Sequence, residues 1–346
     1  MAKQITIRSF LLVLMIALVI TACAPQMTPS PIPAAVSPDA PLETAVVIPP
    51  PTPSPQPRSV YLIAPVDMDQ GTLRNYQEFL SQRAALGGFL FERLESFPPD
   101  GDHLAPKIAV FLDPPEDIRN LADSLPETQF VVLTDQEINP TANLSVIIQS
   151  PAQQAFLAGF IAILVAQDYR AGGLFADNTP LLDQIQDGYL NGARYLCGRC
   201  TPVYGPIVAF PQVAIVPGNS PPDIWQTAFD QLDLTRIHTL FIPSQAAEPQ
   251  FLNYLSTQNV ALLGTQTPPE GFADNWIATV QVDTISALDQ LWPDLINGNG
   301  GQTIFAGLVL SEVNENLLTP GKMIMVEQVK DDLQAGWISP HTVREE

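Results

Sequence analysis

The chain has 346 residues, with 36 acidic side chains against 15 basic ones, and its formal net charge is -21 at pH 7. A surface this acidic repels phosphate backbones, so nucleic acid is excluded as an expected partner. Roughly 290 residues follow a proline-rich stretch near the start, which is more than one typical domain and suits a two-lobed α/β protein.

The first 22 residues read as a lipoprotein signal peptide. Lys3 and Arg8 precede an apolar run from Phe10 to Ile20, and Ile20-Thr21-Ala22-Cys23 follows, which is the layout of a secretory signal. A Cys after Ile-Thr-Ala looks like a bacterial lipobox, which implies cleavage before Cys23 and acylation of its thiol. The alternative is an uncleaved membrane anchor. Either way the bulk of the chain is expected outside the cytoplasmic membrane, attached to it through the anchor.

Residues 23–57 form the expected tether. They contain Pro49-Pro50-Pro51 and Pro53-Ser54-Pro55 and almost no charge. Such a composition cannot bury enough apolar surface to fold, and it favours extended polyproline segments. The folded part is therefore predicted to span residues 58–346.

The first half of that folded part alternates apolar runs with helical patterns. Between Phe91 and Lys107 there is too little chain for a full helix and its loops, so we expect this lobe to have lost or shortened one helix. Helices are expected from about Leu73 to Ala85 and up to about Leu125. The expected strands are Val60–Pro65, Gly88–Phe91, Lys107–Leu112, Gln129–Thr134 and Leu144–Ile148.

The second half opens with a helix that is apolar on all sides, Ala155–Ala166, which is too short to span a bilayer and is therefore expected inside a globular protein. An amphipathic helix follows from Leu182 to Leu196. Strand and helix alternation predicts parallel sheets with right-handed crossovers. Further helices are expected at Ile224–Leu234, Pro249–Gln258 and through Leu295, and strands at Gly172–Ala176, Val203–Val208, Thr239–Ile242, Ala261–Gly264, Trp276–Val282 and Ile304–Leu310.

Two motifs carry a resemblance to a known family. Phe156-Leu157-Ala158-Gly159-Phe160 and Gly188-Tyr189-Leu190-Asn191-Gly192 are similar to motifs of the basic membrane protein family, the lipoproteins that bind purine nucleosides for ABC-type importers. The resemblance extends, more weakly, from about Ser59 to Pro340. It implies a type I periplasmic-binding-protein fold, in which two doubly wound parallel-sheet lobes are joined by a hinge.

The resemblance also implies how the chain is divided between the lobes. Lobe 1 would hold about residues 58–150 and part of 265–312, and lobe 2 about 151–264 and the C-terminal segment. In the family the late segments cross back and forth between lobes. The hinge is then expected near Ile148–Pro151, Thr265–Thr267 and Leu310–Val313.

Ligands of open α/β sheets collect at the carboxyl ends of the strands, where loops converge. The loops at these positions are rich in Asp, Asn, Gln, Ser and Thr, which can hydrogen-bond to hydroxyls and ring nitrogens. The alternative is that these residues are there because they favour turns. The candidate ligand-binding residues are Asp67, Asp69, Arg74, Asn75, Asp113, Asp177, Asn178, Ser244, Gln245, Thr265 and Gln266.

The resemblance is incomplete at the residues that would contact the ligand. Family members carry an Asp-rich first loop and then a Phe that stacks on the base. Asp67, Asp69 and Asn75 fit that pattern, but Arg74 stands at the Phe position, and Thr265-Gln266 replaces a later Asp. The implied ligand is therefore a purine nucleoside or another small polar metabolite.

Cys197-Gly-Arg-Cys200 is the sharpest chemical motif. A redox Cys-x-x-Cys needs its first thiol at a helix N-terminus, where the thiol pKa is lowered, and this pair ends a helix instead. A structural disulfide is favoured outside the cytoplasm over a redox centre or a zinc site. The three histidines, His103, His238 and His341, lie in unrelated segments, so no catalytic triad can be assembled, and we expect no catalytic residue, metal or cofactor.

These observations predict a non-enzymatic, lipid-anchored, extracytoplasmic solute-binding protein that delivers its ligand to an ABC-type permease. Affinity would come from hydrogen bonds in the cleft and from closure of the hinge. The alternative is a degenerate binding fold, used as a sensory or structural surface lipoprotein without a transported ligand.

Overall fold

The computed structural model describes residues 58–66, 68, 70–98 and 105–341. The expected signal peptide, tether and lipidation site at Cys23 lie outside the described residues, as do Asp67, Asp69 and His103. Every described element belongs to one compact unit, Pro55–Glu346.

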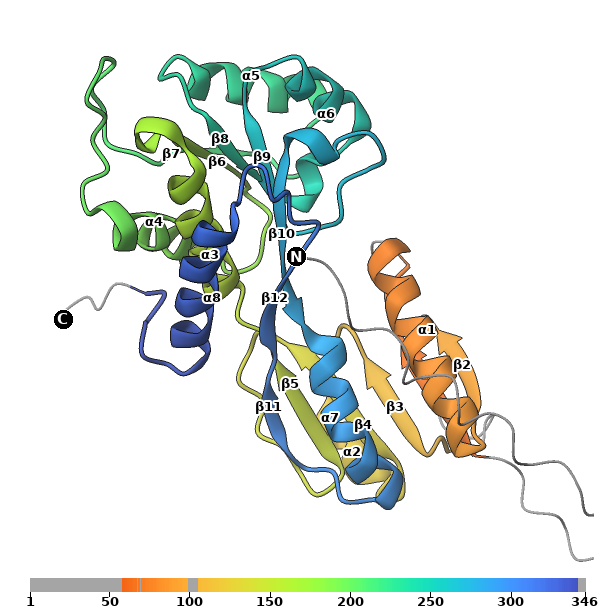
Figure 1. Cartoon of the computed structure of the whole chain (residues 1–346). Coiled ribbons are helices and arrows are strands. Elements are labelled where there is room, and N and C mark those ends of the chain that lie inside the picture. The colour runs from red at the N-terminus through yellow and green to blue at the C-terminus, as the bar shows by residue number, and fades with distance from the viewer. Residues whose placement is uncertain (1–57, 67, 69, 99–104, 342–346) are drawn as a thin grey trace, which may run out of the picture. The chain divides into compact units, whose positions relative to one another are not determined.

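Two six-stranded sheets, flanked by helices, form the framework of this unit (Figure 1). The first sheet has the order β11-β5-β4-β3-β1-β2 and is parallel throughout. Its strands are β1 Ser59–Ile63, β2 Leu90–Leu94, β3 Ile108–Phe111, β4 Gln129–Thr134, β5 Leu144–Ile148 and β11 Thr303–Phe305.

The second sheet has the order β12-β10-β9-β8-β6-β7 and is parallel except that β12 runs antiparallel to β10. Its strands are β6 Ala171–Ala176, β7 Gln212–Val216, β8 Thr239–Ile242, β9 Ala261–Gly264, β10 Trp276–Asp283 and β12 Gly307–Ser311. The helices are α1 Gln70–Gly87, α2 Ile118–Ser124, α3 Pro151–Val165, α4 Leu182–Cys197, α5 Pro222–Asp233, α6 Pro249–Ser256, α7 Thr284–Asn297 and α8 Pro320–Gln334.

The strands of the first sheet are apolar on both faces because helices cover both. Alternate residues of β1 enter different hydrophobic clusters: Val60 and Leu62 pack with α1 and α7 on one face, whereas Tyr61 and Ile63 pack with α2 on the other. A parallel strand buried on both faces reads as a continuous apolar run, which is why these strands are visible in the sequence.

Helix α3 lies in the hydrophobic core that includes the second sheet and has no solvent-exposed face, as its sequence predicts. Its N-terminus is capped by Ser150, whose side chain accepts a hydrogen bond of 3.3 Å from the Gln153 amide. A Cβ added to Gly159 would lie 2.0 Å from the Tyr189 carbonyl oxygen, and one added to Gly192 would lie 1.9 Å from the Phe156 carbonyl oxygen. The two motifs that resemble the basic membrane protein family therefore form the contact between α3 and α4.

The expected strand Val203–Val208 is wrong. These residues form an irregular loop, and the strand that pairs with β6 is β7, Gln212–Val216. Pro202 and Pro206 have no amide hydrogen to donate to a ladder, whereas every residue of Gln212–Val216 has one.

The expected strand Ile304–Leu310 is two strands in different sheets. It breaks at Ala306, where the chain leaves β11 in the first sheet and enters β12 in the second. The continuous apolar pattern conceals this break, because both halves of the run pair with a sheet.

The chain crosses between the sheets at three places in the described residues. The first crossing, at Ile148–Pro151, agrees with the expected hinge. The other two lie between β10 and α7 and at Ala306, so the hinges expected at Thr265–Thr267 and Leu310–Val313 are wrong. Both predictions failed because β9 and β10 are neighbours in the second sheet, and because α8, which follows β12, packs on the same core as α3.

The described residues between β2 and β3, 95–98 and 105–107, contain no helix, in keeping with the shortened first lobe. Among all described residues, no helix combines the length and apolar character needed to cross a membrane.

Candidate functional site

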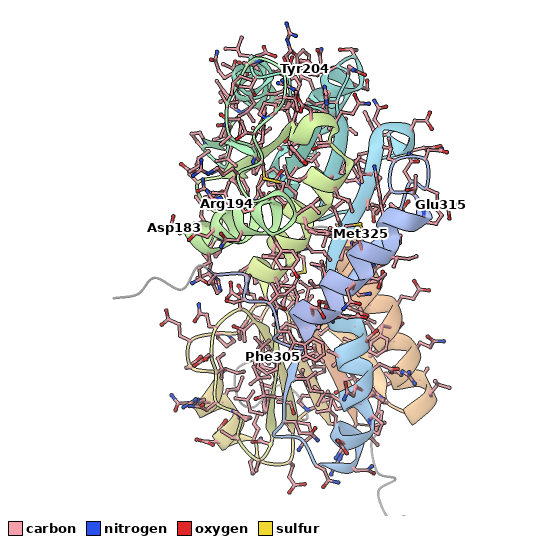
Figure 2. All side chains as sticks on the ribbon, turned by 60° about the vertical axis from the view of Figure 1, so that its left-hand side comes forward. Asp183, Arg194, Tyr204, Phe305, Glu315 and Met325 are labelled. Carbon is pink, nitrogen blue, oxygen red and sulfur yellow. A yellow bond between two sulfur atoms is a disulfide. The ribbon has the colours of Figure 1, made fainter. Side chains whose placement is uncertain are left out.

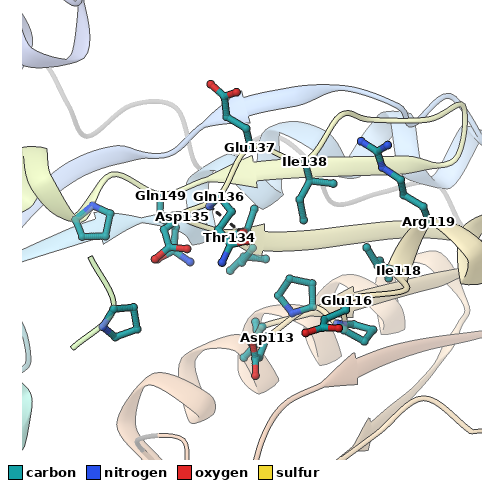
Figure 3. Close-up of a pocket in the computed structure, with 16 residues that line it drawn as sticks. Asp113, Glu116, Ile118, Arg119, Thr134, Asp135, Gln136, Glu137, Ile138 and Gln149 are labelled. Atoms are coloured by element: carbon teal, nitrogen blue, oxygen red, sulfur yellow. Dashed lines mark hydrogen bonds between the residues drawn. The ribbon is translucent and has the colours of Figure 1, made fainter. Parts of the chain in front are cut away.

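A cavity of about 700 Å³ lies at the carboxyl edge of the first sheet (Figure 3). The loops that follow β3 and β4 and the start of α3 line it, together with Pro180, which follows β6 of the second sheet. We call it the Asp113 cavity. Its position fits the rule that ligands of α/β sheets bind beyond the carboxyl ends of the strands, and its size suits a small molecule.

The lining of the Asp113 cavity is acidic. Asp113 and Glu116 follow β3, Asp135 and Glu137 follow β4, and Arg119 is the one basic residue among the lining residues. The Arg119 guanidinium donates a hydrogen bond of 3.4 Å to the Asn139 carbonyl oxygen, and none of the four carboxylates forms an ion pair within the described part of the chain. The local field therefore disfavours anionic ligands and favours neutral or cationic ones.

The loop after β4 is held in place by backbone contacts. The Thr134 side-chain oxygen accepts a hydrogen bond of 3.0 Å from the Gln136 amide, and the Thr134 carbonyl oxygen accepts one of 2.8 Å from the Gln149 amide. The first bond lies within the loop, and the second joins the ends of β4 and β5. They leave the side chains of Asp135 and Gln149 at the cavity with both acceptor and donor groups available.

A second cavity, of about 580 Å³, is also lined by the loop after β4. Residues from two of the crossings between the sheets line it, Gln149–Gln153 after β5 and Phe305–Gly307 between β11 and β12, together with the end of α8. Asp135, Gln136 and Glu137 line both cavities. This loop is therefore positioned where the two halves of the unit meet.

Of the candidate residues expected from the sequence, Asp113 lines the first cavity. Arg74 and Asn75 are exposed on α1, and Asp67 and Asp69 lie outside the described residues. Those in the second-sheet loops line neither of the two cavities: Asp177, Asn178, Ser244, Gln245, Thr265 and Gln266.

Several of these residues have local structural partners. An Asp177 carboxylate oxygen accepts a hydrogen bond of 2.9 Å from the Gly218 amide, which ties the loop after β6 to the loop after β7. Ser244 donates a 3.2 Å bond to its neighbour Gln245, and the Gln266 carbonyl oxygen accepts a 3.2 Å bond from Thr279. The side chains of Asp177 and Ser244 therefore form hydrogen bonds within the loops of the second sheet.

The sequence reasoning missed the loop after β4. The strand was expected to end at Thr134, and the residues after it are Asp135-Gln136-Glu137. The rule applied to the other strand ends would have selected them, so the signal was present in the sequence. Gln149 carried the same signal, because it directly follows the expected strand Leu144–Ile148.

Cys197 and Cys200 form a disulfide at the C-terminal end of α4. This is the bonded pair that the spacing and helix position favoured. Among the described residues no group of three or more His, Cys, Asp or Glu side chains is arranged to hold a metal ion.

No protein-family model and no curated protein sequence matches the chain. Solved structures do. An ABC transporter system solute-binding protein from Conexibacter woesei DSM 14684 has a TM-score of 0.65 at 14% identity, covering 82% of this chain and 98% of that one. ABC transporter system solute-binding proteins from Aeropyrum pernix K1 give 0.58 at 16% identity, with 84% and 94% covered.

A LacI family transcriptional regulator from Enterococcus faecium, crystallised with bound ribose, has a TM-score of 0.50 at 10% identity, covering 73% of this chain and 97% of that one. Likeness at such low identity establishes the fold. The chain has the two-lobed periplasmic-binding-protein fold, as predicted. The narrower resemblance, to the basic membrane protein family, stays a prediction.

Proposed function

We propose that the protein is a lipid-anchored, extracytoplasmic solute-binding protein that serves an ABC-type importer and holds a small polar metabolite in the Asp113 cavity. The observation that carries the proposal is the cavity itself, which lies at the carboxyl edge of the first sheet and is also lined by Pro180 from the other half of the unit. A ligand there would contact both halves and so favour the closed arrangement over the open one.

The lining narrows the chemistry of the ligand. Carboxylates of Asp113 and Asp135 and the amide of Gln149 can bind hydroxyl and amino groups, whereas no aromatic side chain is among the lining residues of this cavity. A purine base would lack a ring to stack on there. We therefore place neutral polyols, sugars and small amines ahead of purine nucleosides.

The proposal requires no catalytic step. The partners would be the ligand, a membrane permease that recognises the closed form, and the bilayer through acylated Cys23. The location outside the cytoplasm follows from the signal peptide and the lipobox pattern.

The second candidate is a degenerate binding fold with a sensory or structural role. The absence of a helix in the described residues between β2 and β3, and Arg74 in place of an aromatic residue, motivate it. A cavity filled by Pro114 and Pro115 or by Arg74 would favour it. Instead both prolines line an open space of about 700 Å³, and Arg74 is exposed, which supports the ligand-binding function.

A thermal-shift screen with sugars, polyols, amines, amino acids and nucleosides tests the two candidates. A ligand at a hundred times its dissociation constant stabilises the native state by about 2.7 kcal/mol and raises the melting temperature. For a ligand that does so, Asp135→Asn should weaken binding about tenfold or more, because a hydrogen bond to a charged group is lost. Glu270→Gln, on an exposed residue that lines neither cavity, is the control. A flat screen would favour the degenerate fold.

A further inference from the structure

The segment between α4 and β7, residues 198–211, is an irregular loop that extends away from the second sheet, seen as the green run between these elements in Figure 1. Three of its apolar side chains are exposed: Val203 is 75% exposed, Tyr204 77% and Ile207 61%. Three large apolar side chains exposed within five residues are unusual for a loop of a soluble domain and mark an interaction surface.

A buried arginine holds the backbone of the loop through hydrogen bonds. Arg170 precedes β6 and is 4% exposed. Its guanidinium donates hydrogen bonds of 2.6 Å to the Thr235 carbonyl oxygen, 2.5 Å to that of Tyr204 and 3.3 Å to that of Gly205. The backbone at the centre of the exposed segment is therefore bonded to a charged group in the core, which holds it more strongly than a neutral donor would.

Further contacts hold both ends of the loop. Asp168 pairs with Arg170 at 3.6 Å, and its carboxylate accepts a hydrogen bond of 2.8 Å from the Val203 amide. The Cys197–Cys200 disulfide closes the start, and the Phe210 ring lies under the Arg170 guanidinium at 5.6 Å. Because the loop is already ordered, little conformational entropy would be lost when its exposed side chains meet a partner.

The stretch of sequence that contains the loop differs in charge from the rest of the chain. From Asp187 to Asp223 there is no acidic residue in between, while Arg194 and Arg199 are both present and exposed, in a chain of net charge -21. Figure 2 shows Arg194 and Tyr204 on the half of the unit that holds the second sheet. Charges act over about 8 Å in physiological salt, so this region can approach an anionic surface that the remaining surface would avoid.

We propose that the 198–211 loop docks on the anionic phospholipid surface of the membrane. Tyr and branched apolar side chains suit the boundary between headgroups and acyl chains, and the exposed Arg199 of the loop suits anionic headgroups. The tether of residues 24–57 would extend over roughly 100 Å at about 3.1 Å per residue, so the bilayer is within reach of the loop. That reach rests on the proposed lipid anchor, whereas the test below does not.

Docking would give the anchored protein a second, weaker attachment and so a preferred orientation on the membrane. A single weak contact suffices here, because the tether keeps the loop at a high effective concentration near the bilayer. A protein partner with a carboxylate-rimmed apolar groove is the competing explanation, which the same experiment separates.

The test is vesicle flotation with a chain that begins at Ala24 and carries no acyl group. Both sheets and all three hydrophobic clusters lie in the unit Pro55–Glu346, so this chain keeps the described fold. We expect it to float with phosphatidylglycerol vesicles and less with phosphatidylcholine vesicles. The double variant Tyr204→Ser/Ile207→Ser should reduce partitioning about tenfold or more, because two apolar contacts are lost.

Two further variants make the result specific. Arg194→Gln/Arg199→Gln should remove the preference for phosphatidylglycerol, and Ile324→Ser/Trp337→Ser, which changes two equally exposed apolar residues elsewhere, should leave partitioning unchanged. Circular dichroism melting checks that each variant is folded. The proposal is overturned if the parent chain does not float, if the Tyr204/Ile207 variant floats as well as the parent, or if sedimentation shows a dimer that this variant abolishes.

Discussion

Two helix contacts in this unit are built in opposite ways. In the second half, α3 and α4 meet through glycines, so that the backbone of one helix lies directly on the other: an added Cβ on Gly188 would lie 2.4 Å from the Ala152 carbonyl oxygen. In the first half, α1 and α7 meet through side chains, with Tyr76 hydrogen-bonded to Thr284 and Arg83 paired with Asp289.

The difference determines what each contact tolerates. A backbone contact has no flexible group that can move aside, so any added atom forces the helices apart. A contact through side chains can lose one of its members and relax around it. We therefore expect enlargement to be damaging at α3–α4 and truncation to be only moderately damaging at α1–α7.

The largest effect should come from Gly192→Ala. The new methyl group would lie 1.9 Å from the Phe156 carbonyl oxygen, which cannot move without shifting α3. We expect the free energy of unfolding to fall by about 3 kcal/mol, as in severe overpacking. Urea unfolding followed by circular dichroism measures it.

Gly321→Ala on α8 is the matched control, because a Cβ at that position would meet nothing within 4 Å. Alanine is a better helix former than glycine, so the control should stabilise the protein by about 0.5 kcal/mol. If Gly192→Ala and Gly321→Ala changed the free energy of unfolding equally, the α3–α4 contact would not be sensitive to an added methyl group, and the prediction would be wrong.

An intermediate effect is expected from Tyr76→Phe. The substitution leaves the ring in place and removes the hydroxyl that bonds to Thr284, and both residues are buried. A buried hydroxyl without its partner costs about 1 to 2 kcal/mol, to be measured by the same urea titration. Adding Thr284→Val to it should recover part of the loss, since the remaining polar group is then removed as well.

The same tyrosine should make stability depend on alkaline pH. Burial raises the pKa of Tyr76 from 10.0 to about 12, with the hydrogen bond to Thr284 opposing the shift. A raised pKa in the folded state contributes stability below pH 10 that is lost as the pH rises toward 12. Tyr76→Phe should therefore flatten the decline in unfolding free energy over this range. A residual decline is expected from Tyr189, since burial raises the pKa of that side chain as well.

The smallest effect is expected from Arg83→Ala. The ion pair with Asp289 joins side chains that are 36% and 44% exposed, so solvent and salt screen it. It should contribute about 0.5 kcal/mol or less, and less still in high salt. A loss comparable to that of Tyr76→Phe would show that the exposed pair is as important to the α1–α7 contact as the buried one.

Much of the fold could be predicted because strands buried on both faces and an all-apolar helix leave unmistakable patterns. The bounds of β4, β5, β8 and β9 match the expected strands residue by residue. The predictions were wrong where one apolar sequence pattern is compatible with two different structures. Val203–Val208 is as apolar as a strand, yet Pro206 within it has no amide hydrogen for a ladder. Ile304–Leu310 is apolar throughout, although the chain changes from one sheet to the other at Ala306.

The candidate site was less predictable. Strand ends identify loops, but whether a loop faces the cavity depends on the order of strands in the sheet. Asp113 and the missed Asp135 come together because β3 and β4 are neighbours, whereas Thr265 follows a strand of the other sheet and lines neither cavity. Strand order is set by contacts between distant segments, which a single sequence does not display.

The strand order also bears on how the protein is made. The first sheet is completed by β11, and its α1 face by α7, yet both are synthesised after the whole run from α3 to β10. While the chain emerges, β5 has an open edge and the apolar residues of β1 and β3 lack part of their cover. The first half can therefore complete its core only after the second half has been synthesised, and its exposed strand edge and apolar surface are open to aggregation during that interval.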